Sequence, residues 1–240
     1  MPEITLKAYC TEIEELIDQG SLDQAISHCQ HILKTYPKYL PAYSLMGKAA
    51  LEKDELSAAA DLFSRVLSMA PDDFVARVGL AIASDQTKTL DEAVWHMERA
   101  FELAPDNQAI ISELRRLYGR RDGVEPEKIP LSRGALARLY ARGNLYTQAI
   151  QEFRRLLEHE PNRMHLQVAL AETLWQANHR IEAAETSLKI LEKLPYCLKA
   201  NLILGEIWFS SGREQEGTAH LERAQMIDPQ NETAQALFGE

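Results

Sequence analysis

Proline residues recur at a fixed interval along this chain of 240 residues. Two runs of three prolines each have a spacing of 34 residues: Pro37, Pro71 and Pro105, then Pro161, Pro195 and Pro229. Only the step between the runs differs, because it is 56 residues long, one interval plus 22 extra residues. A period near 34 is typical of solenoids in which each period supplies one pair of antiparallel helices. The spacing therefore predicts an all-α chain of stacked helix pairs.

Residues at equal distances before each proline predict the second helix of each pair. A small residue stands 12 positions before every proline: Ala25, Ala59, Ala93, Ala149, Ala183 and Gly217. Mostly bulky residues follow four positions later and apolar residues seven positions later, so these side chains share one helix face. The small residue lets the backbones of two crossing helices approach closely. Each proline then ends its helix, because it has no N–H to donate.

The join between the two helices of a pair is expected 17 positions before each proline. The residues there are Gly20, Asp54, Lys88, Asn144, Asn178 and Gly212. All except Lys88 tolerate the left-handed backbone conformation that ends many helices. Asp73, Asn107 and Asn231 each stand two positions after a proline, where we expect them to cap the next helix.

This 34-residue pattern resembles the tetratricopeptide repeat. The resemblance is clearest in YSLMGKAALEKDELSAAADLFSRVLSMAP and GALARLYARGNLYTQAIQEFRRLLEHEP. Glu12, Ile13, Arg77 and Ser187 depart from the large or small apolar residues of the repeat. The resemblance covers about 195 residues. It implies an α-solenoid, a right-handed superhelix of about six helix-turn-helix units with extra lone helices.

The 22 extra residues divide the chain into two halves. Ile111, Leu114 and Leu117 have helical spacing, but the segment DGVEPEKIP follows where a partner helix would stand. We interpret the insertion as a lone helix that caps the first three units. The superhelix is expected to break or bend near residues 119–130. The predicted domains are three units in residues 1–105, a lone capping helix with its linker in 106–129, three units in 130–229 and the start of a C-terminal capping helix in 230–240.

Composition limits the classes of partner. The net charge is -10, and only residues 106–163 carry an excess of basic side chains, 11 against 8 acidic ones. A nucleic-acid binder normally has a clearly basic face, so we expect no nucleic-acid partner. The sequence has no signal peptide and no apolar run that could span a membrane. Its three scattered cysteines fit a reducing compartment. We therefore expect no membrane partner and a cytoplasmic location.

Motifs for catalysis or cofactor binding are absent from the sequence: it has no phosphate loop, nucleophile elbow or HExxH segment. The densest group of metal-ligand types is His28, Cys29 and His31. No second ligand pair with a known spacing accompanies it, and Cys29 falls on the predicted core face. We therefore expect a protein that is not an enzyme and that has no cofactor and no metal site.

In the family that this chain resembles, the first helices line a concave groove that holds a peptide or a partner protein. One subgroup grips a C-terminal carboxylate with Lys and Asn, and that clamp is absent here, so a chaperone tail is not expected as the partner. Two interpretations of Trp175 and Phe209 stay open, as binding anchors or as rings packed between helices. The groove candidates are Lys48, Val78, Ile82, Arg138, Arg142, Val168, Glu172, Trp175, Leu202, Glu206 and Phe209.

A basic anchor is the second candidate site. It comprises Arg115, Arg116, Arg120 and Arg121, which precede Arg138 and Arg142 in the sequence. Guanidinium groups bind carboxylates in a bidentate manner, which would suit an acidic peptide. The alternative is that these arginines form surface ion pairs with Asp122, Glu125 and Glu127.

The sequence thus predicts a scaffold for protein–protein interaction that binds a peptide or a partner protein in its groove. An alternative is a regulatory or oligomerisation arm of a larger protein or enzyme that extends past residue 240. Homodimerisation through the end helices is a further alternative.

Overall fold

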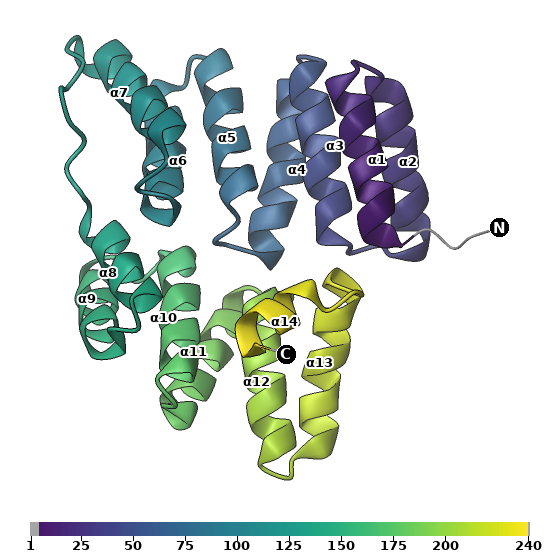
Figure 1. The fold of residues 1–240 in the computed structure, drawn as a ribbon, viewed down its shortest axis with the longest axis vertical. Helices are drawn as coiled ribbons and strands as arrows, with labels where there is room; N and C mark the ends of the chain where they lie inside the picture. The colour runs from purple at the N-terminus through teal and green to yellow at the C-terminus, as the bar shows by residue number, and fades with distance from the viewer. Residues whose placement is uncertain (1–4, 240) are drawn as a thin grey trace.

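A computed structural model describes residues 5–239, and within this range every regular element is an α-helix. The first seven helices are α1 (Leu6–Asp18), α2 (Leu22–Thr35), α3 (Leu40–Glu52), α4 (Leu56–Met69), α5 (Phe74–Gln86), α6 (Leu90–Leu103) and α7 (Gln108–Asp122). The next seven are α8 (Arg133–Arg142), α9 (Tyr146–His159), α10 (Met164–Gln176), α11 (Arg180–Lys193), α12 (Leu198–Ser210), α13 (Glu214–Ile227) and α14 (Glu232–Phe238). The chain forms six helix pairs, and each of the six prolines follows the second helix of one pair. Two further helices, α7 and α14, follow the third and sixth pairs (Figure 1). The predicted all-α solenoid is confirmed.

The joins within the pairs adopt the left-handed conformation. All six residues that stand 17 positions before the prolines have positive φ: Gly20, Asp54, Lys88, Asn144, Asn178 and Gly212. Lys88 adopts this conformation with φ 65°, although its side chain disfavours it. The position in the repeat therefore overrides the preference of the residue.

Small residues permit close helix contacts where the period predicted them. Ala25, Ala59, Ala93, Ala149 and Ala183 are fully buried. The ring of Phe63 lies between Gly47 and Gly79, and a Cβ added to Gly47 would stand 2.7 Å from that ring. Two glycines therefore make room for one large aromatic side chain.

Two of the three predicted N-caps are confirmed. Asp73 accepts a hydrogen bond from the N–H of Ala76 at 2.7 Å, and Asn107 accepts one from the N–H of Ala109 at 3.0 Å. The prediction for Asn231 is wrong, because this residue has φ 56° and its side chain caps nothing. Asp228 replaces it by accepting from the N–H of Thr233 at 2.7 Å.

A side-chain donor closes four of the turns between pairs. The sixth residue after the proline donates to the carbonyl oxygen of that proline, and these donors are Tyr43, Arg77, Gln167 and Asn201, at 2.8, 3.1, 2.5 and 3.0 Å. This bond explains why Arg77 departs from the apolar pattern of the repeat. Donors of different length make this bond, and three of the four are neutral.

The chain reverses direction after α7. We call α1–α7 the N-terminal module and α8–α14 the C-terminal module. Residues 124–132 carry no helix, and α8 then contacts α6. In Figure 1 the N-terminal module runs from α1 to α7 and the C-terminal module runs back below it. The break expected near residues 119–130 is therefore a reversal that brings the proline turns of the two modules together.

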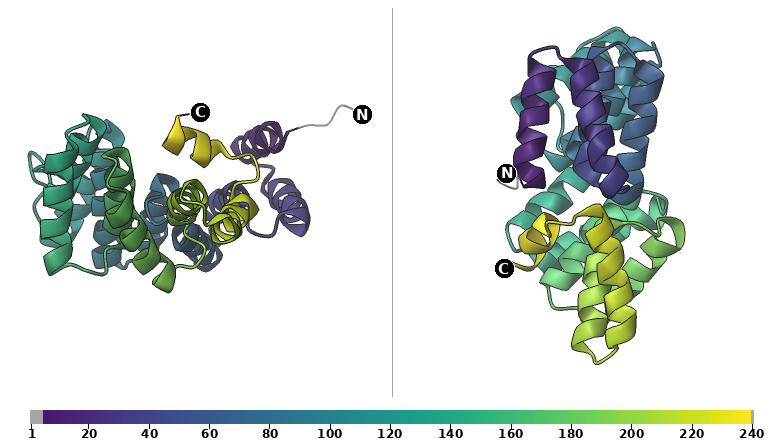
Figure 2. Two further views of the ribbon diagram at one scale, coloured as in Figure 1. Left: turned by 90° about the horizontal axis from the view of Figure 1, so that it is seen from below. Right: turned by 90° about the vertical axis from the view of Figure 1, so that its right-hand side faces the viewer.

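Apolar and charged contacts join the two modules. Met69 of α4 packs into the hydrophobic core of the C-terminal module, and Lys38 lies 3.5 Å from the ring centroid of Tyr196. α1 and α14 lie close together (Figure 2), with an ion pair between Lys7 and Glu232 at 2.9 Å. The junction therefore extends from the linker to the first helix of the chain.

Candidate partner-binding groove

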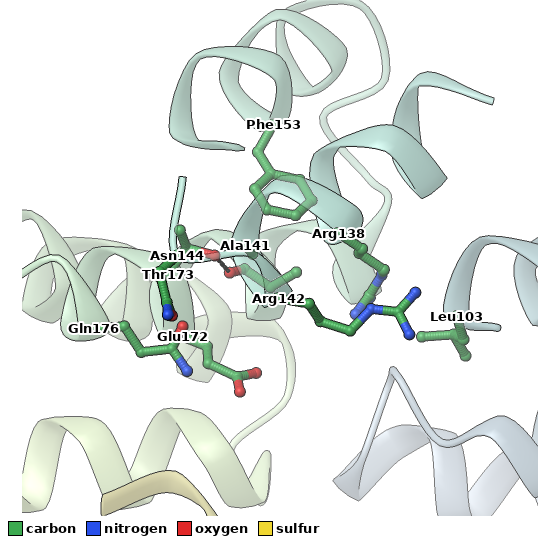
Figure 3. A pocket seen from close by; sticks show the side chains of 10 residues that line it. Leu103, Arg138, Ala141, Arg142, Asn144, Phe153, Glu172, Thr173 and Gln176 are labelled. Atoms are coloured by element: carbon green, nitrogen blue, oxygen red, sulfur yellow. Dashed lines mark hydrogen bonds between the residues drawn. The ribbon is translucent and has the colours of Figure 1, made fainter. Parts of the chain in front are cut away.

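The first helices α8 and α10 enclose a pocket of about 230 Å³, and Leu103 at the end of α6 adds to its wall. Its polar lining comes from Arg138 and Arg142 on α8, from Asn144 after α8, and from Glu172, Thr173 and Gln176 on α10 (Figure 3). These helices lie side by side because their small residues, such as Ala137 and Ala171, are fully or almost fully buried between them. The structure thus brings together three of the predicted groove residues, Arg138, Arg142 and Glu172.

The two arginines of this pocket differ in their surroundings. Arg138 donates from Nη2 to the carbonyl oxygen of His165 at 3.0 Å, and its Nε is buried without a partner. Burial lowers the pKa of Arg138, although Asp72 and Glu172 oppose this shift. Arg142 is exposed, and no carboxylate within residues 5–239 forms an ion pair with it. The pocket therefore carries a positive charge that is not neutralised at Arg142.

Lys199 of α12 connects this groove to the junction between the modules. Its Nζ lies 2.7 Å from Glu172 and 2.9 Å from Asp72 in the turn before α5. Burial would lower the pKa of Lys199, but the two carboxylates outweigh burial and raise it. The carboxylate of Glu172 is thus already engaged by a cation of the same chain.

The aromatic candidates Trp175 and Phe209 have different environments. The ring of Trp175 meets Phe238 of α14 edge to face, with 5.2 Å between the ring centroids, and the guanidinium of Arg180 lies 3.5 Å from its centroid. Phe209 is 50% exposed. The helix α14 therefore covers Trp175, while Phe209 offers a free apolar surface.

Other predicted groove residues are less available. Val168 and Leu202 are 1% and 4% exposed, so their prediction as groove-lining residues is wrong: they fill the core of the C-terminal module. Lys48 forms an ion pair with Glu14 at 2.8 Å. The side chains of Val78, Ile82 and Glu206 are half-buried.

The four arginines of the predicted basic anchor all form ion pairs. Arg115 lies 3.2 Å from Glu125, and Arg121 lies 2.7 Å from Asp122, as the surface alternative predicted. Arg116 and Arg120 both contact Asp85 of α5. These contacts could not be predicted from the sequence, because Asp85 is 31 residues away from Arg116 and 35 residues away from Arg120. The arginines of α7 fasten that helix to α5 and leave little free charge for a partner.

Glu102 of α6 is a buried charge that sequence reasoning missed. It is 5% exposed and accepts hydrogen bonds from Arg163 and from Nε2 of His165. Burial would raise the pKa of Glu102, but His165 and Arg163 lower it to about 2. A Cβ on Gly134 would lie 2.7 Å from the carboxyl carbon of Glu102, so a larger residue there would displace this carboxylate. These partners are distant in the sequence and only the reversal of the chain unites them.

Potential metal ligands do not gather in the described part of the chain, residues 5–239. At the histidine pair singled out in the sequence, His28 Nδ1 lies 2.6 Å from the hydroxyl of Tyr9, and Cys29 is fully buried. None of the described helices has the length and apolar character needed to cross a membrane.

Comparison with known proteins identifies the type of repeat. Residues 16–73 and residues 135–179 each match a family model described as tetratricopeptide repeat, one in each module. Together with the helix pairs and the 34-residue period, these matches define a solenoid of tetratricopeptide units. The chain is therefore a protein that contains tetratricopeptide repeats in both of its modules. Members of this family are in general scaffolds for protein–protein interaction without catalytic activity.

Solved structures of the same kind are similar to this chain. A tetratricopeptide repeat protein from Parabacteroides merdae is 14% identical, with 96% of both chains covered and a TM-score of 0.45. MamA AMB-1 is 19% identical over 77% of this chain and 96% of its own, with a TM-score of 0.37. YrrB, described as having an unusual peptide-binding site, is 14% identical over 84% of this chain and 93% of its own, with a TM-score of 0.38. No curated protein matches the sequence.

Proposed function

We propose that this chain is a non-catalytic scaffold that binds an acidic segment of a partner protein in the groove of its C-terminal module. The observation that carries the proposal is the pair of guanidinium groups in the pocket between α8 and α10. Arg142 is exposed without an ion pair among the described residues, and Arg138 keeps a buried Nε without a partner. Arginine is suited to bind carboxylates because its planar guanidinium offers two parallel donors.

The helix α14 supports an apolar component of the same interaction. Its residues Leu237 and Phe238 contact the C-terminal module, and Phe238 lies against Trp175. Because α14 occupies this surface in the structure, a partner helix that carries an aromatic side chain would bind there in place of α14. Phe209, half exposed on the next first helix, would extend the apolar surface for a longer partner.

Capture of partners from a native lysate, quantified by mass spectrometry, tests the proposal. Arg142→Glu reverses the charge in the pocket at an exposed position, where the fold tolerates it. Arg223→Glu makes the same change on α13, at an arginine that is also exposed and without an ion pair in the described range. We expect proteins captured by the wild type to be lost with Arg142→Glu and kept with Arg223→Glu. Equal recovery by both variants would contradict a binding site in this groove.

A further inference from the structure

A second cavity, of about 670 Å³, lies at the junction of the two modules. The N-terminal module contributes residues of α4, α5 and α6 to its wall, and the C-terminal module contributes residues around the turn between α9 and α10. Leu67, Leu80, Met164 and Leu194 form apolar parts of the wall, next to the ring of Trp95. Polar and charged side chains, among them His159, Glu160 and Arg163, complete the wall. A cavity of this size that combines apolar surface with polar groups is typical of sites for small molecules.

Arg77 places a charge without a counterion in this cavity. It is 6% exposed, and no carboxylate of residues 5–239 lies within ion-pair distance of it. Its Nη2 donates to the carbonyl oxygen of Pro71, while its Nε is buried without a partner. At the equivalent position of another unit, the neutral Gln167 makes the same bond to Pro161. The turn therefore requires a donor at this position but no positive charge.

Other charged groups near Arg77 are already paired within the chain: Arg99 with Glu98, and Arg163 of the cavity wall with Glu102 and Glu160. The guanidinium carbons of Arg77 and Arg99 lie 5.3 and 4.4 Å from the ring centroid of Trp95. His96 also lines the cavity, and its Nδ1 is buried without a partner. Burial and then the charge of Arg99 lower the pKa of Arg77 to about 10. Burial and then the charges of Arg77 and Arg99 lower the pKa of His96 to about 4.

We infer that this cavity binds a small amphipathic anion, an organic molecule that carries a carboxylate or a phosphate group. The anionic group would lie at Arg77 and His96, and the apolar part would contact Trp95 and the leucines. Two physical reasons support this occupant. A buried charge without a counterion is unfavourable, so an anion that enters gains an interaction that this chain leaves unmade. A guanidinium also binds either oxyanion through paired donors.

This site is separate from the groove of the proposed function. The groove pocket contains Arg138 and Arg142, neither of which lines the second cavity. Failure of one proposal therefore leaves the other intact, because Arg142 can be changed without touching Arg77.

Fluorescence of Trp95 provides a direct assay. In a chain with Trp175→Phe and Trp208→Phe, Trp95 is the remaining tryptophan. It would be titrated with phenyl phosphate, phenylacetate, inorganic phosphate and the neutral benzyl alcohol. We expect a saturable change with at least one aromatic anion, at least tenfold tighter binding than that of inorganic phosphate, and no saturable change with benzyl alcohol. The tighter of the two aromatic anions identifies the source of the charge as phosphate or carboxylate.

The matched variants are Arg77→Gln and Arg142→Gln. Arg77→Gln keeps a donor to Pro71, as Gln167 does in its own unit, and is expected to weaken the aromatic anion at least tenfold. Arg142→Gln is expected to leave this affinity unchanged. The inference is overturned if Arg77→Gln binds as tightly as the parent chain, if benzyl alcohol binds as well as the anions, or if no probe saturates up to about 10 mM.

Unfolding in urea without any probe distinguishes a binding role of Arg77 from a purely structural one. A ligand-binding arginine without a counterion costs stability, so Arg77→Gln should be at least as stable as the parent chain. His96→Ala is a second variant that leaves the turn at Pro71 untouched and should also weaken the anion. A destabilised Arg77→Gln, together with unchanged affinity in His96→Ala, would overturn the inference.

Discussion

The helices α7 and α14 occupy equivalent places in the sequence but pack differently. An offset of 124 residues superposes the prolines of the two modules, and it also superposes the start of α7 on the start of α14. α7 stacks on α6 and buries Ile110, Leu114 and Leu117. α14 instead contacts α12 and turns Phe238 toward Trp175 of α10. One lone helix continues the stack of helices, whereas the other folds back over the groove.

The residue that precedes each lone helix has a different backbone conformation in the two modules. Asn107 precedes α7 with φ -76° and caps it, whereas Asn231 precedes α14 with φ 56° and does not. The apolar residues differ too, because Ala234 stands where α7 has Ile110. A small side chain gives α14 less apolar area to bury against the preceding pair. The repeat thus determines where a helix starts, while the apolar side chains and the cap determine where it packs.

The sharpest test of this comparison is a buried charge in each lone helix. Leu117 is fully buried in α7, so Leu117→Asp should lower the free energy of unfolding by more than about 4 kcal/mol. Leu237→Asp in α14 should lower it by only about 1 kcal/mol, because a helix of seven residues that buries only Leu237 can detach locally. Urea unfolding followed by circular dichroism measures both. Equal losses would mean that α14 is as integral to the fold as α7.

A smaller loss of stability is expected from a substitution at the junction of the two modules, at Glu102 of α6. Glu102→Gln removes the counterion of Arg163 from a buried site and should lower the free energy of unfolding by about 3 kcal/mol. Glu102→Asp is the control, because it keeps the charge. The matched residue of the C-terminal module, Met226, is exposed, so Met226→Gln should change stability by less than about 0.5 kcal/mol.

The difference in stability between the wild type and Glu102→Gln should depend on pH, because the pKa of Glu102 is lowered in the folded chain. That pKa is about 2 in the folded chain against 4.5 ordinarily, so the unfolded chain takes up a proton first as the pH falls. The stabilisation by Glu102 is therefore complete above pH 4.5 and declines between pH 4.5 and 2. Stability measured for wild type and Glu102→Gln at pH 7 and pH 3 should differ much more at pH 7. A constant difference would contradict an ionised Glu102 at the junction.

The period of the prolines predicted most of the fold, because close helix contacts and left-handed joins recur at fixed positions whatever the remaining residues are. The departures Ser187 and Arg77 were visible in the sequence, but their reasons were not. Ser187 stands 124 residues after Phe63, and Ile203 stands 124 residues after Gly79. The N-terminal module thus pairs a large Phe63 with the small Gly79, whereas the C-terminal module has the small Ser187 and the large Ile203 at the equivalent positions.

The candidate site was predictable only where it lies within one module. Arg138, Arg142 and Glu172 come together because they lie on neighbouring first helices, whose spacing the repeat defines. Contacts across the reversal, such as those of Glu102 with Arg163 and of Lys199 with Asp72, join residues 61 and 127 positions apart. Nothing in a repeat pattern encodes the direction that a linker gives to the second module.

The smallest predicted effect compares Lys88 with Gly212, which are related by the same offset and both have positive φ. A lysine in this conformation is strained through its Cβ, whereas glycine is not. Lys88→Gly should therefore raise the free energy of unfolding by about 0.5 kcal/mol, since the loss of strain exceeds the added chain entropy of the unfolded state. The reverse change Gly212→Lys should lower it by a similar amount, because nothing lies within 4 Å of a Cβ there and only the backbone resists. Thermal and urea unfolding of both variants measure the pair, and changes of the same sign would show that the two joins are not equivalent.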